Sequence, residues 1–186
     1  MKNNNLFFKA FIKNPRQVGA LKQTSNFVIK EIVKSIDFEK ARCLVELGGG
    51  MGNITKKIIN KMHPECILFC FEIDPILAKH LAEKIQDNRV RIISDSAENI
   101  GKYLLQSNIE RVDYVISTVP LTTIPYRKMK EILKLSFQYL RGGGKYIQVQ
   151  YSLLGRRYLR MLFPKIGVNF VFLNIPPAFV YICVKN

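Results

Sequence analysis

The chain has 186 residues, of which 48% are hydrophobic and 23% are charged, and this composition excludes wholesale disorder. Its length suits one domain with a substantial core and is short for two. The formal net charge is +15, and from Tyr114 onward eleven Lys and Arg stand against one acid, Glu131. Such a balance predicts an anionic partner, and both a membrane surface and a nucleic acid satisfy it.

The cysteines lie inside apolar runs without a C-x-x-C pair, which indicates buried free thiols rather than disulfides or a metal site. Lys9 and Lys13 interrupt the apolar residues near the N-terminus, so we expect no secretory signal and a cytoplasmic protein. The uncharged span from Ile166 to Val184 has the length of a membrane helix. Because Pro176-Pro177 breaks this span, it predicts two adjacent strands instead.

Residues 1–40 predict a helical extension of the same domain, with one helix over 5–14 and another from a Ser25 N-cap to Ile36. From 41 to 186, apolar runs alternate with helical patterns. The predicted strands are 43–47, 66–71, 90–94, 112–116, 144–150, 168–173 and 178–184, and the predicted helices are 53–62, 75–86, 97–107 and 125–140. The alternation predicts an α/β domain whose doubly wound, seven-stranded, mostly parallel sheet carries helices on both faces. Ligands of such sheets bind beyond the carboxyl ends of the strands.

A glycine loop follows the first predicted strand. Gly48, Gly50 and Gly52 alternate with other residues and precede a helix that starts at Asn53. Glycine permits positive φ and close backbone approach, so such a loop can cradle an anionic group, although a structural turn is the alternative. The dinucleotide fingerprint has G-x-G-x-x-G, whereas this loop has G-x-G-x-G after the acidic Glu46, which disfavours a dehydrogenase.

Acids follow the next two predicted strands. Glu72 lies about twenty residues beyond the loop, the spacing at which a carboxylate reaches ribose hydroxyls. Asp74 precedes Pro75 and is better explained as a helix N-cap. Asp95 and Ser96 follow the third strand, where an adenine amino group can bind, and an N-cap is again the alternative for Asp95. The loop and the acids together predict a nucleotide-like cofactor.

Over residues 42–150 these motifs resemble those of class I S-adenosylmethionine-dependent methyltransferases, which are Rossmann-like. The resemblance implies S-adenosylmethionine as cofactor, S-adenosylhomocysteine as product, and no metal. It places the Gly48–Gly52 loop at the methionine part of the cofactor and includes Glu46 among the cofactor-binding residues. It places Glu72 at the ribose hydroxyls, and Asp95 with Ser96 at the adenine.

The stretch Ser117-Thr118-Val119-Pro120-Leu121 follows the fourth strand, where many methyltransferases meet the methyl acceptor. Ribosomal RNA adenine dimethylases resemble this chain in the glycine loop and usually carry Asn-x-Pro-Tyr here. With Pro120 aligned, Thr118 and Leu121 stand in place of the Asn and the aromatic residue. This resemblance implies an RNA adenine N6-methyltransferase as one alternative.

The chain resembles more closely the short bacterial phospholipid N-methyltransferases, which methylate the amine of phosphatidylethanolamine. The resemblance rests on four stretches: Phe7–Pro15 with Val18-Gly19-Ala20, Glu46–Gly52, Ser117–Leu121 and Leu173–Ala178. It implies a phospholipid substrate, and a peripheral position on the inner face of the cytoplasmic membrane. A non-catalytic cofactor-binding module is a further alternative, and no obligate protein partner is evident.

Two basic stretches favour a membrane on physical grounds. Residues 5–14 form a short amphipathic pattern with Lys9 and Lys13 on one face, which predicts a helix that docks on a membrane or covers the core. The second stretch holds Arg156, Arg157 and Arg160, for which a solvated helix face is the alternative. Lys22, Arg156 and Arg157 are candidates to pair with a lipid phosphate.

Methyl transfer from a sulfonium requires an amine lone pair in line with the methyl group, so orientation is the main expected source of catalysis. No residue is identified as a general base, because His63 and His80 fall on predicted helices at positions typical of solvated faces. Tyr126 and Tyr181 are candidate contacts for the amine or the phosphate, with structural packing as the alternative.

Overall fold

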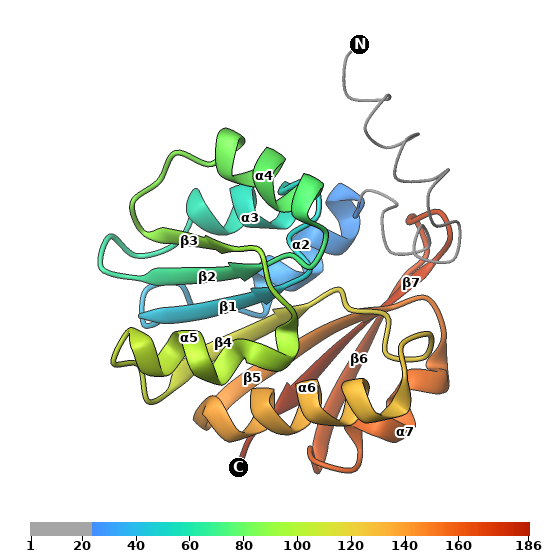
Figure 1. Cartoon of the computed structure of the whole chain (residues 1–186). Helices are drawn as coiled ribbons and strands as arrows, with labels where there is room; N and C mark the ends of the chain where they lie inside the picture. Colours follow the sequence, from blue (N-terminus) through green and yellow to red (C-terminus); the bar gives the residue numbers. More distant parts are fainter. Residues whose placement is uncertain (1–23) are drawn as a thin grey trace.

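Seven strands form one mixed sheet in the computed structural model, which describes residues 24–186 (Figure 1). The strands are β1 (Cys43–Leu47), β2 (Ile67–Phe71), β3 (Val90–Ile93), β4 (Val112–Ser117), β5 (Leu140–Gln150), β6 (Lys165–Val171) and β7 (Ala178–Val184). Their order is β3-β2-β1-β4-β5-β7-β6. Strands β1 to β5 pair in parallel, and β7 runs antiparallel to both β5 and β6. The predicted seven-stranded, mostly parallel sheet is therefore confirmed.

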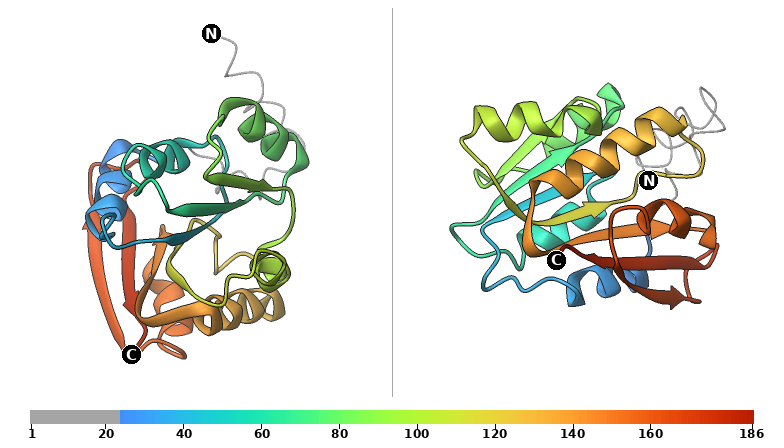
Figure 2. Two further views of the ribbon diagram at one scale, coloured as in Figure 1. Left: turned by 90° about the vertical axis from the view of Figure 1, so that its left-hand side faces the viewer. Right: turned by 90° about the horizontal axis from the view of Figure 1, so that it is seen from below.

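Helices cover both faces of the sheet (Figures 1 and 2). They are α2 (Asn26–Lys34), α3 (Asn53–Ile59), α4 (Pro75–Lys84), α5 (Ile100–Gln106), α6 (Tyr126–Tyr139) and α7 (Arg156–Leu159), with 3-10 turns η1 (Ala97–Asn99) and η2 (Leu153–Gly155). Buried side chains of α2 and α3 pack on one face, and those of α5, α6 and α7 pack on the other. All five residues of β1 are buried, as expected of a strand with both faces covered.

The predicted helix over 5–14 and the candidate cations Lys9, Lys13 and Lys22 lie outside the described residues. The second predicted N-terminal helix is present as α2. Its Ser25 N-cap accepts a hydrogen bond from the Val28 N–H (3.4 Å), and Val28, Ile29 and Ile32 are buried.

Several element boundaries differ from the predicted ones. The predicted helix 97–107 begins as the turn η1, so α5 starts only at Ile100. Helix α3 ends at Ile59, which places His63 in the following turn rather than on a helix. Strand β5 starts at Leu140 instead of 144, because a shift in its pairing with β4 and a positive φ at Gly143 (74°) accommodate the extra residues.

The two C-terminal strands form the predicted adjacent pair. The first of them, predicted over 168–173, spans Lys165–Val171 instead and ends opposite Ala178. Residues 172–177 make the connection between them. Among the described residues, no helix combines the length and the apolar character that crossing a membrane requires.

Candidate active site

The glycine loop lies at the carboxyl end of β1, beside the carboxyl end of β2. The N–H groups of Gly48 and Gly49 both donate to the carbonyl of Phe71 (2.8 and 3.0 Å), which fixes the start of the loop. Gly48, Gly50 and Gly52 have φ of 88°, 52° and 80°, a region that residues with a Cβ rarely adopt. A Cβ on Gly50 would meet nothing within 4 Å, so this glycine borders open space. The loop therefore offers its backbone to a ligand at Gly50.

Glu72 closes the loop from the end of β2. Its Oε2 accepts from the Gly50 N–H (2.8 Å) and its Oε1 accepts from the Asp74 N–H (2.9 Å). The side chain is buried, and burial raises the pKa of the Glu72 carboxyl above its ordinary value. A carboxylate has about four acceptor positions, so this one retains capacity for hydroxyl donors. Ile73, which follows it, is 64% exposed and presents an apolar surface at the same place.

Glu46 lies beneath the loop with no exposed surface. Its Oε2 accepts from the Thr55 hydroxyl (2.8 Å) and the Cys70 thiol (3.4 Å). Its Oε1 has no hydrogen-bond partner among the described residues. Burial raises the pKa of the Glu46 carboxyl to about 7. A buried acceptor without a donor is costly, and a cationic or donating group at this loop would lower that cost.

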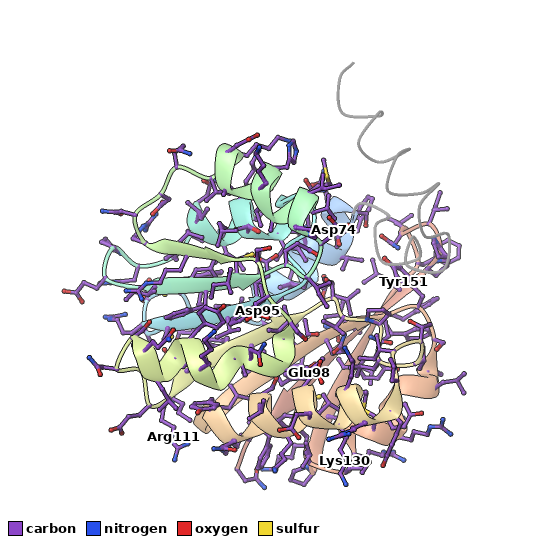
Figure 3. The ribbon with its side chains drawn as sticks, viewed as in Figure 1. Asp74, Asp95, Glu98, Arg111, Lys130 and Tyr151 are labelled. Atoms are coloured by element: carbon purple, nitrogen blue, oxygen red, sulfur yellow. The ribbon has the colours of Figure 1, made fainter. Side chains whose placement is uncertain are left out.

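Asp95 stands at the carboxyl end of β3, between Asp74 and Glu98 in the view of Figure 3. Its carboxylate accepts from the Asn99 amide (2.8 Å), the Tyr103 hydroxyl (2.8 Å) and the Ser96 N–H (2.7 Å). The bonds from Asn99 and Tyr103 lower the pKa of Asp95. The N-cap of the following turn is Ser96, not Asp95, so the alternative role of Asp95 as an N-cap is wrong, and three other donors hold its carboxylate at the end of β3.

Asp74 caps α4, as the sequence pattern indicated. Its Oδ1 accepts from the N–H groups of Ile76 (2.8 Å) and Leu77 (3.2 Å). Asp74 therefore has a structural role in the placement of α4, while Glu72 faces the loop.

The acceptor candidates after β4 are buried or half-buried. Ser117 is fully buried, and its hydroxyl accepts from the Val119 N–H (3.3 Å). The Thr118 hydroxyl donates to the carbonyl of Gly48 (3.0 Å) and so joins the end of β4 to the glycine loop. Pro120 is half-buried, and Leu121 is in the core at 1% exposure. A side chain at position 121 is thus unable to stack on a base.

Two glutamines of β5 complete this region, and the sequence interpretation missed them. The Gln148 amide donates to the carbonyls of Ser117 and Val119 (both 3.0 Å), and the Gln150 amide also donates to the Val119 carbonyl (2.9 Å). The Tyr146 hydroxyl donates to the Gln148 carbonyl oxygen (2.6 Å). Both glutamines are buried. The sequence did contain a signal for them, because Gln148 and Gln150 are polar residues two positions apart in an apolar strand and therefore lie on the same face of the sheet.

The two candidate tyrosines have different environments. Tyr181 is fully buried, its hydroxyl donates to the Ser152 carbonyl (3.3 Å), and burial raises its pKa. These contacts are those of a packing residue. Tyr126 is 57% exposed at the start of α6, with its ring centroid 6.2 Å from that of Tyr158.

The candidate cations Arg156, Arg157 and Arg160 follow β5, at the edge of the sheet that also carries the glycine loop. Arg157 donates to the Tyr158 hydroxyl (2.6 Å) and Arg160 is exposed. Arg156 is half-buried, and within the described residues its Nε has no hydrogen-bond partner. No contact in the structure tests their predicted pairing with a lipid phosphate.

Within residues 24–186, no cluster of three or more His, Cys, Asp or Glu side chains is arranged to hold a metal ion. The cysteines are free and buried, as their sequence context indicated.

The sheet order, the glycine loop after β1 and the acids after β2 and β3 define a class I S-adenosylmethionine-dependent methyltransferase. The residues present fit this cofactor. Gly50 borders open space that would admit the methionine part of the cofactor, and Glu72 would offer acceptor positions to ribose hydroxyls. The Glu46 oxygen that lacks a partner among the described residues would suit a donating or cationic group.

The family model for ribosomal RNA adenine dimethylases matches residues 17–153. An ornithine lipid N-methyltransferase of Singulisphaera acidiphila is 31% identical over 98% of this chain and 96% of that protein. A Methanococcoides burtonii protein named "Probable ribosomal RNA small subunit methyltransferase A" is 25% identical over 60% of this chain and 40% of that protein. The N-methyltransferase NodS of Bradyrhizobium japonicum, whose structure was solved with S-adenosylhomocysteine, shares the fold with a TM-score of 0.64. The similarity covers 88% of this chain and 89% of NodS, at 11% sequence identity.

The chain belongs to the ribosomal RNA adenine dimethylase family of methyltransferases, and its relative over nearly the full length of both chains acts on a lipid. It is an S-adenosylmethionine-dependent enzyme rather than a non-catalytic module, and the predicted cofactor is confirmed.

Proposed function

We propose that the enzyme transfers methyl groups to the primary amine of a membrane-lipid headgroup, at the inner face of the cytoplasmic membrane. Phosphatidylethanolamine and an ornithine lipid both present such an amine. The observation that carries the proposal is the 31% identity to an ornithine lipid N-methyltransferase over nearly all of both chains. The cationic C-terminal region supports it, since anionic membranes attract clustered Lys and Arg.

The region after β4 also supports a small amine rather than a base. Base recognition of the kind expected in RNA adenine dimethylases uses an aromatic residue at the position of Leu121. Here Leu121 is buried in the core, and Thr118 is hydrogen-bonded to Gly48 instead of facing an acceptor. Stacking on a base is worth about 1–3 kcal/mol per base in proteins that use it, and this position does not supply it.

The chain's part in the reaction is to orient the amine. When bound, S-adenosylmethionine supplies an electrophilic methyl group on a sulfonium whose thioether leaves without needing a proton. Gln148 and Gln150 hold the segment after β4 through the Val119 carbonyl, and Thr118 ties that segment to the cofactor loop. The two sides of the site are thereby kept in a fixed relation, and well-oriented approach can supply roughly 7–11 kcal/mol of the barrier.

The amine must be neutral when it attacks. A lysine-like amine with a pKa of about 10.4 costs roughly 4–5 kcal/mol to deprotonate near pH 7. A desolvated position beside the buried β4 segment would lower this cost, because burial disfavours the charged form of an amine.

RNA is the second candidate acceptor, favoured by the family model and by the net charge of +15. Purified enzyme with labelled S-adenosylmethionine should be tested on vesicles with phosphatidylethanolamine, on vesicles with ornithine lipid, and on ribosomal RNA. The expected result is label in one or both lipids and none in RNA. Label found in RNA alone would refute the lipid proposal.

A further inference from the structure

The connection between β6 and β7 carries a cluster of exposed apolar side chains. Phe172, Leu173 and Ile175 are 72%, 61% and 78% exposed. We call these three residues the hairpin tip. Three large apolar side chains therefore lie exposed within four consecutive positions. Contiguous exposed apolar patches are uncommon on soluble proteins and mark sites that bind another protein or a membrane.

The tip is built to hold its side chains outward. Asn174, in the middle of it, is 4% exposed. Its carbonyl oxygen accepts from the Ser25 N–H (3.4 Å), and its amide donates to the Pro176 carbonyl. The polar residue of the turn is therefore turned inward, bound to the start of α2, while the apolar residues on either side of it face solvent.

The tip lies at the same edge of the sheet as the active site. Strand β7 is antiparallel to β5, with Gln150 opposite Phe179, and β6 ends with Val171 opposite Ala178. Residues 172–177 thus leave the sheet where β5 ends, and β5 is parallel to β1 and β4, whose carboxyl ends hold the glycine loop and Thr118. Figure 3 shows Tyr151, the residue after β5, beside this connection.

Cations and further apolar residues surround the same edge. Leu153 and Leu154, which follow β5, are 55% and 65% exposed, and the exposed Arg157 and Arg160 come next. The first turn of α6 holds basic residues and no acid, although cations near a helix N-terminus are unfavourable for the helix itself. From Ile132 to the C-terminus the sequence contains no Asp or Glu.

We propose that the hairpin tip inserts into the acyl region of an anionic bilayer while the neighbouring arginines contact the lipid phosphates, so that the active-site edge faces the headgroups. This inference rests on the proposed lipid function and names the surface that performs the docking. Apolar side chains that enter the membrane, and cations at the same edge of the protein that contact the headgroups, are the two elements of interfacial binding. An RNA surface would use the cations but leave the tip in water.

Binding should be measured by co-sedimentation of the full chain with phosphatidylcholine vesicles, with and without phosphatidylglycerol. We expect the triple variant F172S/L173S/I175S to bind at least about a hundredfold more weakly, since each side chain of this size contributes about tenfold when buried. Leu173→Ser alone should weaken binding about tenfold. The matched control is Leu105→Ser, because Leu105 is 62% exposed on α5 at the opposite edge of the sheet and should not affect binding.

A second pair of variants tests whether the arginines contribute to vesicle binding. The double variant R157Q/R160Q should lose about twentyfold or more on anionic vesicles, at about 1 kcal/mol per cation near the surface, and little on neutral ones. The control is Lys61→Gln, since Lys61 is exposed in the turn after α3 at the far edge.

Cofactor binding by the triple variant shows that it is folded, and its transfer to detergent-dispersed lipid should equal that of the wild type. Wild-type-like vesicle binding by the triple variant, or an equal loss in L105S, overturns the docking surface. A loss of ribosomal RNA binding by R157Q/R160Q without a loss of its binding to anionic vesicles overturns the docking surface also. If the wild type methylates no lipid yet needs the tip to bind vesicles, the proposed function fails and the docking surface stands.

Discussion

The described chain divides at Tyr114 into a formally neutral region and a strongly positive one. Residues 24–113 contain thirteen Lys and Arg and thirteen Asp and Glu, so this region is formally neutral. Residues 114–186 contain eleven Lys and Arg and one acid. The acids of the first region include the buried Glu46 and Glu72 at the cofactor loop. The second region instead combines cations with the exposed hairpin tip.

Under the proposed function, the cofactor and the membrane surface make separate demands on one sheet. A cofactor with an ammonium and ribose hydroxyls requires a few acids held inside the protein. A large anionic surface requires cations and apolar groups on the outside. Variants that affect one region should therefore leave the binding function of the other intact.

The largest expected effect comes from Glu72→Ala. This change removes the predicted acceptor for ribose hydroxyls and the carboxylate that binds the Gly50 N–H. Hydrogen bonds to charged groups are worth about 1.5–3 kcal/mol each. We expect S-adenosylmethionine affinity, measured by titration calorimetry, to fall at least about a hundredfold, with vesicle binding unchanged. The exposed Glu83 on α4, changed to Ala, is the matched control. Unchanged cofactor affinity in the Glu72 variant would contradict the ribose assignment.

The next effect concerns stability against pH. Below pH 4.5, which is the ordinary pKa of a glutamate side chain, Glu46 is protonated in both the folded and the unfolded chain. Its folded pKa is about 7, so between these values only the unfolded chain releases the proton. The free energy of unfolding should therefore fall by about 3 kcal/mol as the pH rises from 4.5 to 7, and level off above that.

Denaturant unfolding of the wild type and of Glu46→Gln between pH 4.5 and 7 isolates the contribution of Glu46 to the pH dependence of stability, because the other ionisable groups are common to both proteins. The variant should become the more stable protein as the pH rises. A constant difference between the two curves would contradict a raised pKa at Glu46.

A smaller effect is expected from Gln150→Ala, which acts on the boundary between the two regions. Loss of its bond to the Val119 carbonyl should cost about 1–3 kcal/mol and loosen the segment after β4. We expect kcat to fall about tenfold with cofactor affinity unchanged. The exposed Gln106 on α5, changed to Ala, should alter neither quantity. A weaker cofactor complex with normal kcat would place Gln150 on the cofactor side instead.

The smallest effect is expected from Tyr181→Phe. The variant loses one hydrogen bond to the Ser152 carbonyl and keeps its ring in the core. The free energy of unfolding should fall by about 0.5–1.5 kcal/mol, with kcat and KM unchanged. A large loss of kcat without loss of stability would return Tyr181 to the acceptor site.

The sequence was most informative where the chemistry depends on neighbouring residues. The strands could be predicted from continuous apolar runs, and the cofactor loop from glycines spaced within five positions. The predicted N-caps Ser25 and Asp74 likewise serve N–H groups two or three residues away. At the next turn the N-cap is Ser96, one residue after the predicted alternative Asp95.

Contacts between distant residues left less trace in the sequence. Gln148 and Gln150 bind carbonyls about thirty residues earlier, and the Ser25 bond to Asn174 spans 149 positions. The inward direction of Thr118 depends on where β4 meets the glycine loop. Such pairings are decided by strand order and register, which a single sequence does not reveal.

The reversed direction of β7 has a practical consequence for experiments on this enzyme. Because β7 runs against its neighbours, it carries the chain away from the active-site edge, and Lys185 donates to the carbonyls of Phe137 and Leu140 at the far edge. A biotin or affinity tag after Asn186 would attach the enzyme to a sensor chip with its catalytic side facing the solution. Vesicles and cofactor could then be flowed over an immobilised protein of uniform orientation.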